Sequence, residues 1–529
     1  MDKYKVINLI IFILCGNLIF VGCTSKTNIN PVEDTTKILN SEQQKGVDNM
    51  ASQDEILENI KVGGFVASAS VHDPSIEIGE DGKYYIFGSH MSAASSQDLK
   101  EWKTIASGVD SNNPLFSNLF ESDFEAFKYV GKNSEDGYSV WAPDIIYNEA
   151  LQKYVMYFCT TSSAVKSNLC MAVSDTLEGP YTYQDTILYS GFTEETIKET
   201  NFYEFMPEDT DLSIYLASAK SYNNYSWPNC IDACLFTDAD GHMWMAYGSW
   251  SGGIFILEID KETGYPIHPV ADEENGVDTY FGKKLIGGLH NPIEGPYIMY
   301  DAESKYYYLF VSYGELTAQG GYQIRLFRSV NPDGPYEDVT GSSPSNGPGY
   351  NKYGVKMMGN YTFPSLNYTY MAPGHCSAFM DKDGKMYVVY HQRFEELGEY
   401  HEPRVHQLFR TKNGWLVAAP FATNGETLRE NGYDLEEVSG TYYMVNHGTD
   451  VTSVIHPSEE VIFHQDGTID GAVQGEYILD EKNAYITIKL GDDQYEGVVI
   501  EMTDEAGNST ICFAAVGSNN ETIWGVQYR

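Results

Sequence analysis

The chain has 529 residues, in which 75 acidic side chains outnumber 33 basic ones and leave a formal net charge of −42. This charge argues against nucleic acid as a partner, because phosphate backbones are repelled, and it favours neutral or cationic ligands. The length allows more than one domain. The 41 tyrosines and 24 phenylalanines, with little leucine-rich helical periodicity, favour an all-β protein.

The N-terminus is predicted to be a targeting segment. Two lysines precede an apolar run over residues 6–21, which has the length of a secretory signal core rather than of a membrane-spanning helix. The run ends in FVGC, which resembles the cleavage box of bacterial lipoproteins. Residues 1–22 are therefore expected to be a lipoprotein signal peptide, with Cys23 as the lipidated first residue of the mature chain. A secreted protein with an incidental cysteine is the alternative.

Residues 23–64 are polar and patternless, which predicts a tether between membrane and folded protein. The protein is therefore expected on the outer surface of a bacterial cell, in contact with the membrane only through its lipid anchor.

Five segments between residues 65 and 428 share one design. Each combines a polar group beside a small residue or proline, an apolar run, a turn rich in Asp, Gly or Asn, and an aromatic strand; the segments are residues 71–89, 141–159, 230–249, 293–312 and 374–392. The β-branched and aromatic residues flanking such turns predict a β-hairpin in each. Five all-strand units of this size predict a five-bladed β-propeller.

Residues 429–529 show alternating strands without this signature. They predict a separate, smaller β-domain, either a β-sandwich or a barrel, that caps the propeller. Six cysteines outside the signal region form no CxxC pair and no zinc-finger spacing. Buried thiols are the default expectation, and a Cys159–Cys170 bond across a hairpin stays open.

Each repeat begins with an ionisable side chain, in the order Asp73, Asp144, Asp232, Glu294 and His375. Because the first strand of every propeller blade lines the central channel, these side chains are expected to converge on one polar pocket. The alternative is that each acid caps a strand or accepts turn N–H groups. Carboxylates without Ser-His or Cys-His pairing favour glycoside hydrolysis, in which one acid protonates the leaving oxygen and another carboxylate activates water or attacks carbon. A third acid raises the pKa of the proton donor by like-charge repulsion.

The motifs that carry these residues resemble glycoside hydrolase family 43, particularly its endo-α-1,5-L-arabinanases. They are HDPS (72–75), WAPD (141–144), the segment 231–254, IEGPY (293–297) and PGHCS (373–377). The resemblance covers residues 65–428 and implies a five-bladed propeller that cleaves plant cell-wall arabinan with inversion. The trailing region resembles the C-terminal β-domain of larger arabinanases.

The same resemblance implies the role of each acid. Asp73 would be the general base, Glu294 the general acid, and Asp232 the residue that tunes the pKa of the acid and positions the substrate.

Five further residues take implied roles by position. Asp144, Trp141, Ser249 and Trp250 would bind substrate in the pocket. His375 would bind a metal ion, usually calcium, directly or through water at the centre of the propeller.

The chain also departs from the family pattern. It has IDA where many relatives have IDP, and SWSGG where arabinanases often have SFWGG. Long insertions at residues 188–229 and 341–372 leave the cleft shape, and so endo or exo action, open. The alternatives are a family 43 α-L-arabinofuranosidase or β-xylosidase, and a non-catalytic lipoprotein that binds arabino-oligosaccharides. A monomer is expected.

Overall fold

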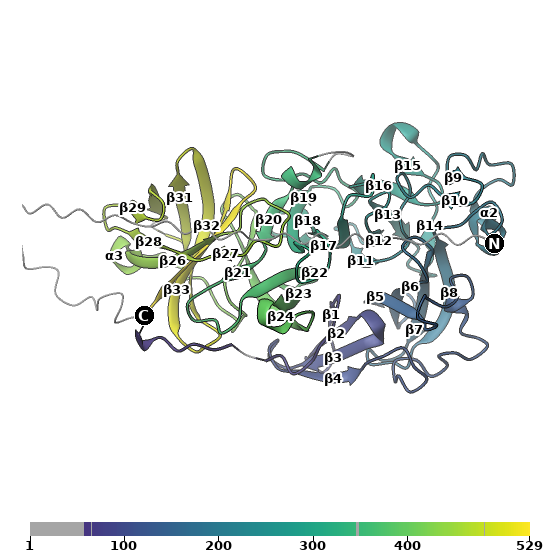
Figure 1. Ribbon diagram of the computed structural model, residues 1–529, viewed down its shortest axis with the longest axis horizontal. Helices are drawn as coiled ribbons and strands as arrows, with labels where there is room; N and C mark the ends of the chain where they lie inside the picture. The colour runs from purple at the N-terminus through teal and green to yellow at the C-terminus, as the bar shows by residue number, and fades with distance from the viewer. Residues whose placement is uncertain (1–57, 65, 345–348, 481) are drawn as a thin grey trace, which may run out of the picture. The chain divides into compact units, whose positions relative to one another are not determined.

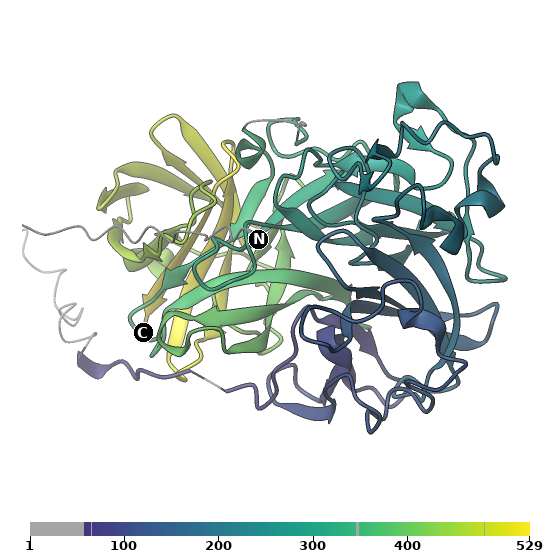
Figure 2. The same ribbon diagram turned by 45° about the vertical axis from the view of Figure 1, so that its right-hand side comes forward.

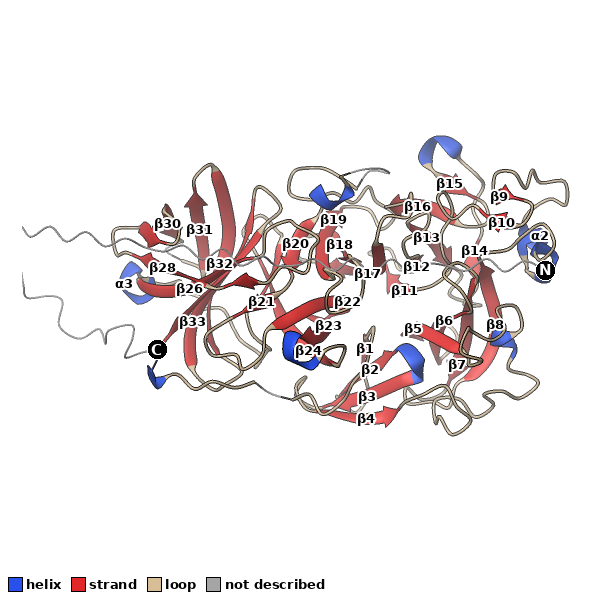
Figure 3. Cartoon of the chain, in the orientation of Figure 1, coloured by secondary structure: helices blue, strands red, loops and turns tan. Residues whose placement is uncertain are grey.

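The computed structural model describes residues 58–64, 66–344, 349–480 and 482–529. The predicted signal peptide, and the tether as far as residue 57, lie outside these residues. In the described part of the chain, strands dominate and the helices are short, as Figure 3 shows in red and blue. None of the described helices is long and apolar enough to cross a membrane.

Five antiparallel sheets form the blades of a β-propeller, which confirms the predicted fold. Figure 1 shows them following one another around a common centre, and Figure 2 shows the same order from a second side. Blade one contains β1 (Ser75–Ile78), β2 (Tyr84–Gly88), β3 (Ser92–Ser96) and β4 (Trp102–Ala106). Blade two contains β5 (Ser139–Asn148), β6 (Lys153–Thr161), β7 (Ser167–Ser174) and β8 (Thr182–Tyr189).

The remaining blades follow the same plan with additions. Blade three contains β11 (Cys234–Thr237), β12 (Met243–Tyr247), β13 (Ile254–Ile259), β14 (Pro266–Ile267), β15 (Val277–Asp278) and β16 (Gly282–Ile286). Blade four contains β17 (Ile293–Asp301), β18 (Tyr306–Tyr313), β19 (Gln323–Ser329) and β20 (Val355–Met358). Blade five contains β22 (Tyr370–Met380), β23 (Met386–Phe394), β24 (His401–Arg410) and β25 (Leu416–Ala418), extended by β21 (Tyr361–Thr362).

The short elements lie mainly between strands. They are η1 (Ser89–Met91), η2 (Glu125–Phe127), η3 (Ile197–Glu199), α2 (Phe202–Phe205), the β9–β10 pair (Leu216–Ser218, Ser221–Tyr222), η4 (Glu273–Asn275), η5 (Tyr350–Lys352), η6 (Glu395–Leu397) and α3 (Leu435–Val438). Four of them, η3, α2, β9 and β10, belong to the insertion at residues 188–229.

The aspartates of the repeat turns explain why the hairpins form where the sequence predicts them. Oδ1 of Asp238 accepts the backbone N–H groups of Asp240 and His242, both at 2.9 Å. Oδ1 of Asp381 accepts those of Asp383 and Lys385 in the same way. Each carboxylate accepts backbone N–H groups that the tight turn leaves without backbone acceptors, so the turn is fixed locally.

Packing of apolar side chains closes the ring between blades one and five. Each described blade is built from consecutive strands, and no strand of blade one joins the sheet of blade five. Val71 and Ile86 of blade one pack with Val389 and Val405 of blade five in one buried cluster. Because fully burying such a side chain contributes about 1.5–3 kcal/mol, these contacts hold the first and last blades together.

The C-terminal region is a closed barrel, which decides between the two predicted alternatives. Its eight strands are β26 (Gly440–Asn446), β28 (Glu459–Phe463), β29 (Thr468–Gly471), β30 (Gly475–Leu479), β31 (Tyr485–Leu490), β32 (Asp493–Thr503), β33 (Ser509–Gly517) and β34 (Thr522–Tyr528). Closure comes from the pairing of β26 with β34, in which Tyr443 lies opposite Val526. This pairing leaves no free edge between the first and last strands.

All six cysteines among the described residues are free and buried. The Cys159–Cys170 bond is not formed, since Cys159 pairs with Leu169 across the hairpin and Cys170 with Phe158. Burial raises the pKa of Cys170 to about 12, which keeps this thiol protonated and unreactive.

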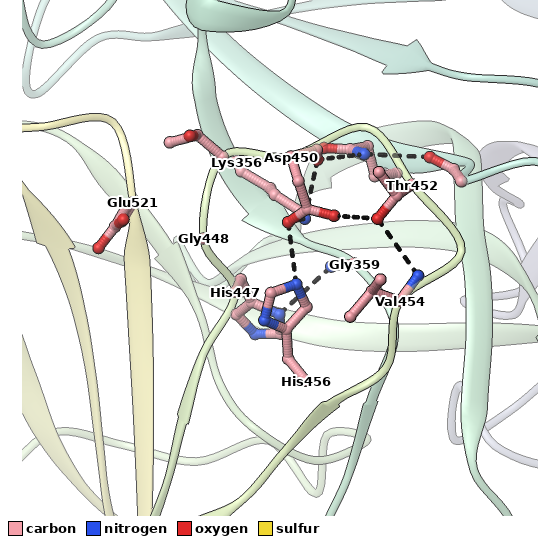
Figure 4. A network of polar contacts seen from close by, with 12 residues as sticks. Lys356, Gly359, His447, Gly448, Asp450, Thr452, Val454, His456 and Glu521 are labelled. Carbon is pink, nitrogen blue, oxygen red and sulfur yellow. Dashed lines mark hydrogen bonds and ion pairs between the residues drawn. The ribbon is translucent and has the colours of Figure 1, made fainter.

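Residues 447–455, which we name the junction loop, follow β26 of the barrel and contact the propeller (Figure 4). Nζ of Lys356 on β20 lies 3.0 Å from both the carbonyl oxygen and Oδ1 of Asp450. Nε2 of His456 lies 2.9 Å from the same Oδ1, and the Thr452 hydroxyl donates to the other carboxylate oxygen. The loop then continues into β27 (His456–Pro457), which pairs in parallel with β21.

Burial lowers the pKa of Lys356 to about 8, and Asp450 acts in the opposite direction. The side chain of Lys356 is only 2% exposed, so its charge depends on this carboxylate. Removing one partner of such a contact leaves a buried ammonium group without compensation.

Asp450→Ala should therefore destabilise the protein by about 2 kcal/mol, the typical loss for hydrogen bonds to a charged group. Urea unfolding followed by tryptophan fluorescence measures the change. Asp175→Ala is the matched control: it removes an ion pair with Lys153 whose side chains are 81% (Asp175) and 37% (Lys153) exposed, and it should leave the midpoint nearly unchanged. Equal shifts in the two variants would contradict the structural role of the Asp450 contact.

Candidate active site

The first strand of every blade contains or follows a residue with a left-handed backbone. One such residue in each blade lies at or near a predicted site residue: they are Asp73, Ala142, Asp232, Gly295 and His375, with φ values of 54°, 35°, 59°, 57° and 43°. In blade five, β22 contains a second one, Ala372, with a φ of 48°. In β5, β17 and β22 the residue lies at a break in strand pairing, which is a β-bulge. Four of the five are not glycine, so the backbone is strained at these points, as is common where side chains are aimed for function.

The left-handed residues show that the predicted alignment of the five repeats is wrong in two blades. Asp73, Asp232 and His375 occupy the left-handed position itself. Glu294 precedes it by one residue, and Asp144 follows it by two. The five leading residues are therefore not structurally equivalent, because the bulge breaks the two-residue period of the strand.

Asp144 lies in a different environment from the other acids. Its carboxylate accepts the Ser75 hydroxyl and, at 2.6 Å, the backbone N–H of Leu235, so it joins the first strands of three blades. Burial raises its pKa to about 6. Asp144 does not line the cavity that the other predicted site residues share.

That cavity has a volume of about 510 Å³. The predicted residues that line it are Asp73, Trp141, Asp232, Ser249, Trp250, Glu294 and His375. Seven further polar residues line the wall and were not predicted as site residues; they are His72, Thr161, Ser163, Asn229, His290, Glu315 and Thr317. Asn229 comes from the insertion before blade three, which contributes to the cavity.

Asp73 is surrounded by imidazoles. Nδ1 of His72 lies 2.7 Å from Oδ2, and Nδ1 of His375 lies 3.1 Å from Oδ1. The Ser89 hydroxyl also donates to Oδ2, and Nδ1 of His391 lies 3.7 Å from Oδ1. Burial alone would raise the pKa of Asp73, but His375, His72 and His391 hold it well below its usual range. Asp73 is therefore ionised at neutral pH.

Glu294 is held by a hydroxyl donor at each carboxyl oxygen. The Tyr322 hydroxyl donates to Oε1 at 2.8 Å, and the Ser249 hydroxyl donates to Oε2 at 2.9 Å. Ser249, predicted as a substrate-binding residue, thus contacts the acid directly, and Tyr322 was not predicted at all. Burial raises the pKa of Glu294, although His375 and the two hydroxyls act in the opposite direction.

Asp232 completes the group of acids. Its Oδ2 accepts the backbone N–H of Gly295 at 3.3 Å, which places it beside Glu294. Burial, followed by the charges of Glu294 and Asp73, raises the pKa of Asp232 well above its ordinary value. The pKa values of the neighbouring acids Asp232 and Glu294 are therefore both raised, in contrast to that of Asp73.

Two places could accept a cation. The side-chain donor atoms of His72, Asp73 and His391 lie within 4.8 Å of one another, but an Arg393 nitrogen lies 3.0 Å from Nε2 of His72 and its positive charge opposes a metal ion there. At His375, Nδ1 faces Asp73, and Nε2 makes no hydrogen bond with a described residue. A single imidazole nitrogen on the cavity wall fits a hydrated cation better than a fully protein-ligated one.

The chain matches two family models. Residues 65–200 and 208–416 match the model described as glycosyl hydrolases family 43, and residues 420–525 match a C-terminal lipocalin-like domain associated with that family. An extracellular endo-α-(1→5)-L-arabinanase of Bacillus subtilis is 37% identical over 86% of this chain and 92% of its own length.

Two solved structures have the same organisation. A family 43 glycoside hydrolase from Bacillus licheniformis is 38% identical, with a TM-score of 0.76 over 88% of this chain and 99% of its own. An endo-1,5-α-L-arabinanase from Thermotoga petrophila is 35% identical, with a TM-score of 0.76 over 88% of this chain and 100% of its own.

Gly295→Ala tests how tightly this site is packed. A Cβ atom at Gly295 would lie 3.0 Å from Cγ of His375, so the imidazole must move relative to Asp73. Because displacements near 1 Å can cost about a hundredfold in rate, glycosidase turnover should fall by up to that factor. The measurement is kcat alongside thermal unfolding.

The control is Gly384→Ala in the turn of blade five. Gly384 has a φ of +79°, and its Cβ atom would meet nothing within 4 Å. It shares the backbone strain of Gly295→Ala without the contact to His375. Similar losses of activity in the two variants would show that strain, rather than displacement of the imidazole, is responsible.

Proposed function

Because the chain belongs to glycosyl hydrolase family 43, we propose that it hydrolyses α-1,5-linked L-arabinan by a single displacement with inversion. The names of its relatives support the substrate, since the Bacillus subtilis and Thermotoga petrophila proteins are endo-arabinanases. The observation that carries the mechanism is the contrast between Asp73, whose pKa is lowered among imidazoles, and the buried neighbours Asp232 and Glu294, whose pKa values are raised.

In this mechanism Glu294 is the general acid and Asp73 the general base. Glu294 gives its proton to the glycosidic oxygen as the bond to the anomeric carbon breaks. Asp73 removes a proton from a water molecule that attacks the same carbon from the opposite face, which inverts the anomeric configuration. Each proton transfer typically contributes about 10²–10⁴-fold to the rate.

Asp232 supports the general acid. Its position beside Glu294 and its buried carboxyl disfavour a second negative charge in this half of the cavity, so the pair keeps one proton at neutral pH. This effect does not dominate at Asp73, because His375 and His72 beside its carboxylate lower its pKa. The separation of roles therefore comes from the different neighbours of three acids.

Trp141 and Trp250 are proposed to bind the arabinose rings. Both line the cavity, and aromatic faces suit the apolar C–H surfaces of a sugar. The ring of Trp141 lies edge-on to His90, with 4.6 Å between centroids, and that of Trp250 edge-on to His290 at 5.3 Å. These contacts fix the orientation of the indoles before substrate enters.

The protein is proposed to act outside the cell, as the names of its relatives suggest for them. The lipoprotein signal predicted for residues 1–22 would then hold it at the cell surface through Cys23. Plant cell-wall arabinan, or oligosaccharides released from it, would be the substrate encountered there.

Asp73→Ala and Glu294→Ala should each nearly abolish turnover of linear arabinan. An aryl arabinofuranoside with a good leaving group needs little protonation, so it should restore activity to Glu294→Ala more than to Asp73→Ala. NMR of the first-formed sugar should show an inverted anomer. A retained anomer, or full activity of Glu294→Ala on arabinan, would overturn the assignment.

The products from linear arabinan decide the substrate and the mode of action. Oligosaccharides of mixed length are expected from endo cleavage. Release of arabinose alone would indicate an arabinofuranosidase, and preference for an aryl xyloside would indicate a β-xylosidase. Binding of arabino-oligosaccharides without any turnover would identify a non-catalytic receptor.

We further propose that His375 would hold a calcium ion, directly or through water, at the centre of the propeller. When bound, the ion would add positive charge beside the acids and strengthen their field. Chelation should lower activity, calcium should restore it, and His375→Ala should make the enzyme insensitive to both. His464→Ala, on an exposed barrel residue, serves as the control. Unchanged activity after prolonged chelation would exclude the ion.

A further inference from the structure

We propose that Tyr322 is a positioning residue for the proton donor Glu294, and that the junction loop of the barrel holds Tyr322 in place. The inference rests on the role proposed above for Glu294. It would give the C-terminal barrel a part in catalysis, although none of the described residues of this domain lines the cavity.

The side chain of Tyr322 is buried and packs against blade five. It is 1% exposed and does not line the cavity. Its ring stacks on His391, with centroids 5.7 Å apart and an angle of 15° between planes. It also covers Gly374 so closely that a Cβ atom there would lie 2.2 Å from the ring. With the ring immobilised in this way, the hydroxyl has one fixed direction, toward Glu294.

This hydroxyl is placed to assist proton donation. Tyr322 and Ser249 each hold one oxygen of the carboxyl group, which sets the plane of Glu294. When Glu294 gives up its proton it becomes a buried carboxylate, and a hydrogen bond to that charged form stabilises it as the charge develops. Burial raises the pKa of Tyr322 well above its ordinary value, so the hydroxyl remains a donor throughout.

The junction loop contacts the chain on both sides of Tyr322. On one side, Nε2 of Gln323 donates to the carbonyl oxygen of Asp450 at 2.9 Å. On the other, Gly321 lies so close to the loop that a Cβ atom there would be 2.8 Å from the backbone nitrogen of Thr452. The loop therefore fixes the backbone positions that flank the tyrosine.

Two further contacts strengthen this support. The Arg325 guanidinium, which is fully buried, donates to the carbonyl oxygen of Thr449 at 2.6 Å. Ile455 at the end of the loop packs against the small buried cluster of Tyr322, Met371 and Ala372. Figure 4 shows how the conformation of the loop itself is fixed, through the contacts of Asp450 with Lys356, Thr452 and His456.

Tyr322→Phe separates the hydroxyl from the ring packing. Turnover of linear arabinan should fall by about tenfold to a hundredfold, the value expected for one hydrogen bond to a charged group. KM should change little, because Tyr322 does not line the cavity. On an aryl arabinofuranoside with a good leaving group, the loss in kcat should be several times smaller. An equal loss on both substrates would show a merely structural role and overturn the proposal.

Ile455→Ala tests the contribution of the barrel. It should cause a smaller loss of the same kind, greater on arabinan than on the aryl substrate. In the double variant with Tyr322→Phe it should add nothing, because both act on one hydrogen bond. Ile478→Ala, on a barrel residue that is 70% exposed, is the matched control and should leave activity unchanged. Independent, additive losses would overturn the role of the junction loop.

The Glu294→Gln background distinguishes this inference from the function on which it rests. If Glu294→Gln itself retains full activity on arabinan, the role proposed for Glu294 fails. If Glu294→Gln is inactive on arabinan but Tyr322→Phe is fully active, only the positioning role is overturned. Loss of activity in both single variants, with no further loss of residual activity when they are combined, is the expected result.

Discussion

The left-handed residue at the start of each blade is the constraint on which the site depends. A regular strand alternates its side chains between two faces, so it cannot place consecutive polar groups toward the same cavity. The bulge at this position adds one residue and redirects the side chain. Asp73, Asp232 and His375 occupy it directly, while in blade four Gly295 occupies it and places Glu294 one residue earlier. Glycine is needed there because His375 fills the space where a Cβ atom would stand.

Charge is distributed unevenly around the cavity that results. Imidazoles surround Asp73, whereas Glu294 and Asp232 have hydroxyl and backbone N–H partners and one another. The pKa of the same kind of side chain is therefore lowered on one wall and raised on the other. This asymmetry is what an acid and a base acting on one glycosidic bond require.

The barrel contacts the propeller at the residues next to Tyr322, whose hydroxyl donates to Glu294. The junction loop contacts both neighbours of Tyr322, which lies just before β19, and a buried lysine on β20 holds the loop in place. The barrel follows all the motifs that carry the acids in the sequence, yet it contacts the residues on both sides of Tyr322, a direct partner of Glu294. Stability at the junction and geometry at the site rest on the same loop.

The sequence by itself determined the five hairpins, because their signals are local: alternating strands and aspartates that accept the N–H groups of their own turns. It also determined which motifs carry the acids and the cavity tryptophans. The repeat pattern wrongly predicted that Asp144 and Glu294 are structurally equivalent to Asp73, Asp232 and His375. A bulge shifts side chains by one or two residues without altering the composition of the motif.

Only the tertiary structure decided features that depend on contacts distant in the chain. Closure of the barrel needs β26 to pair with β34, about which neither strand carries information alone. The role of Tyr322 likewise appears only when blade four, blade five and the barrel meet, because an aromatic residue before a strand is indistinguishable in sequence from ordinary core packing. Local patterns specify the units, and their assembly specifies which side chains face each other.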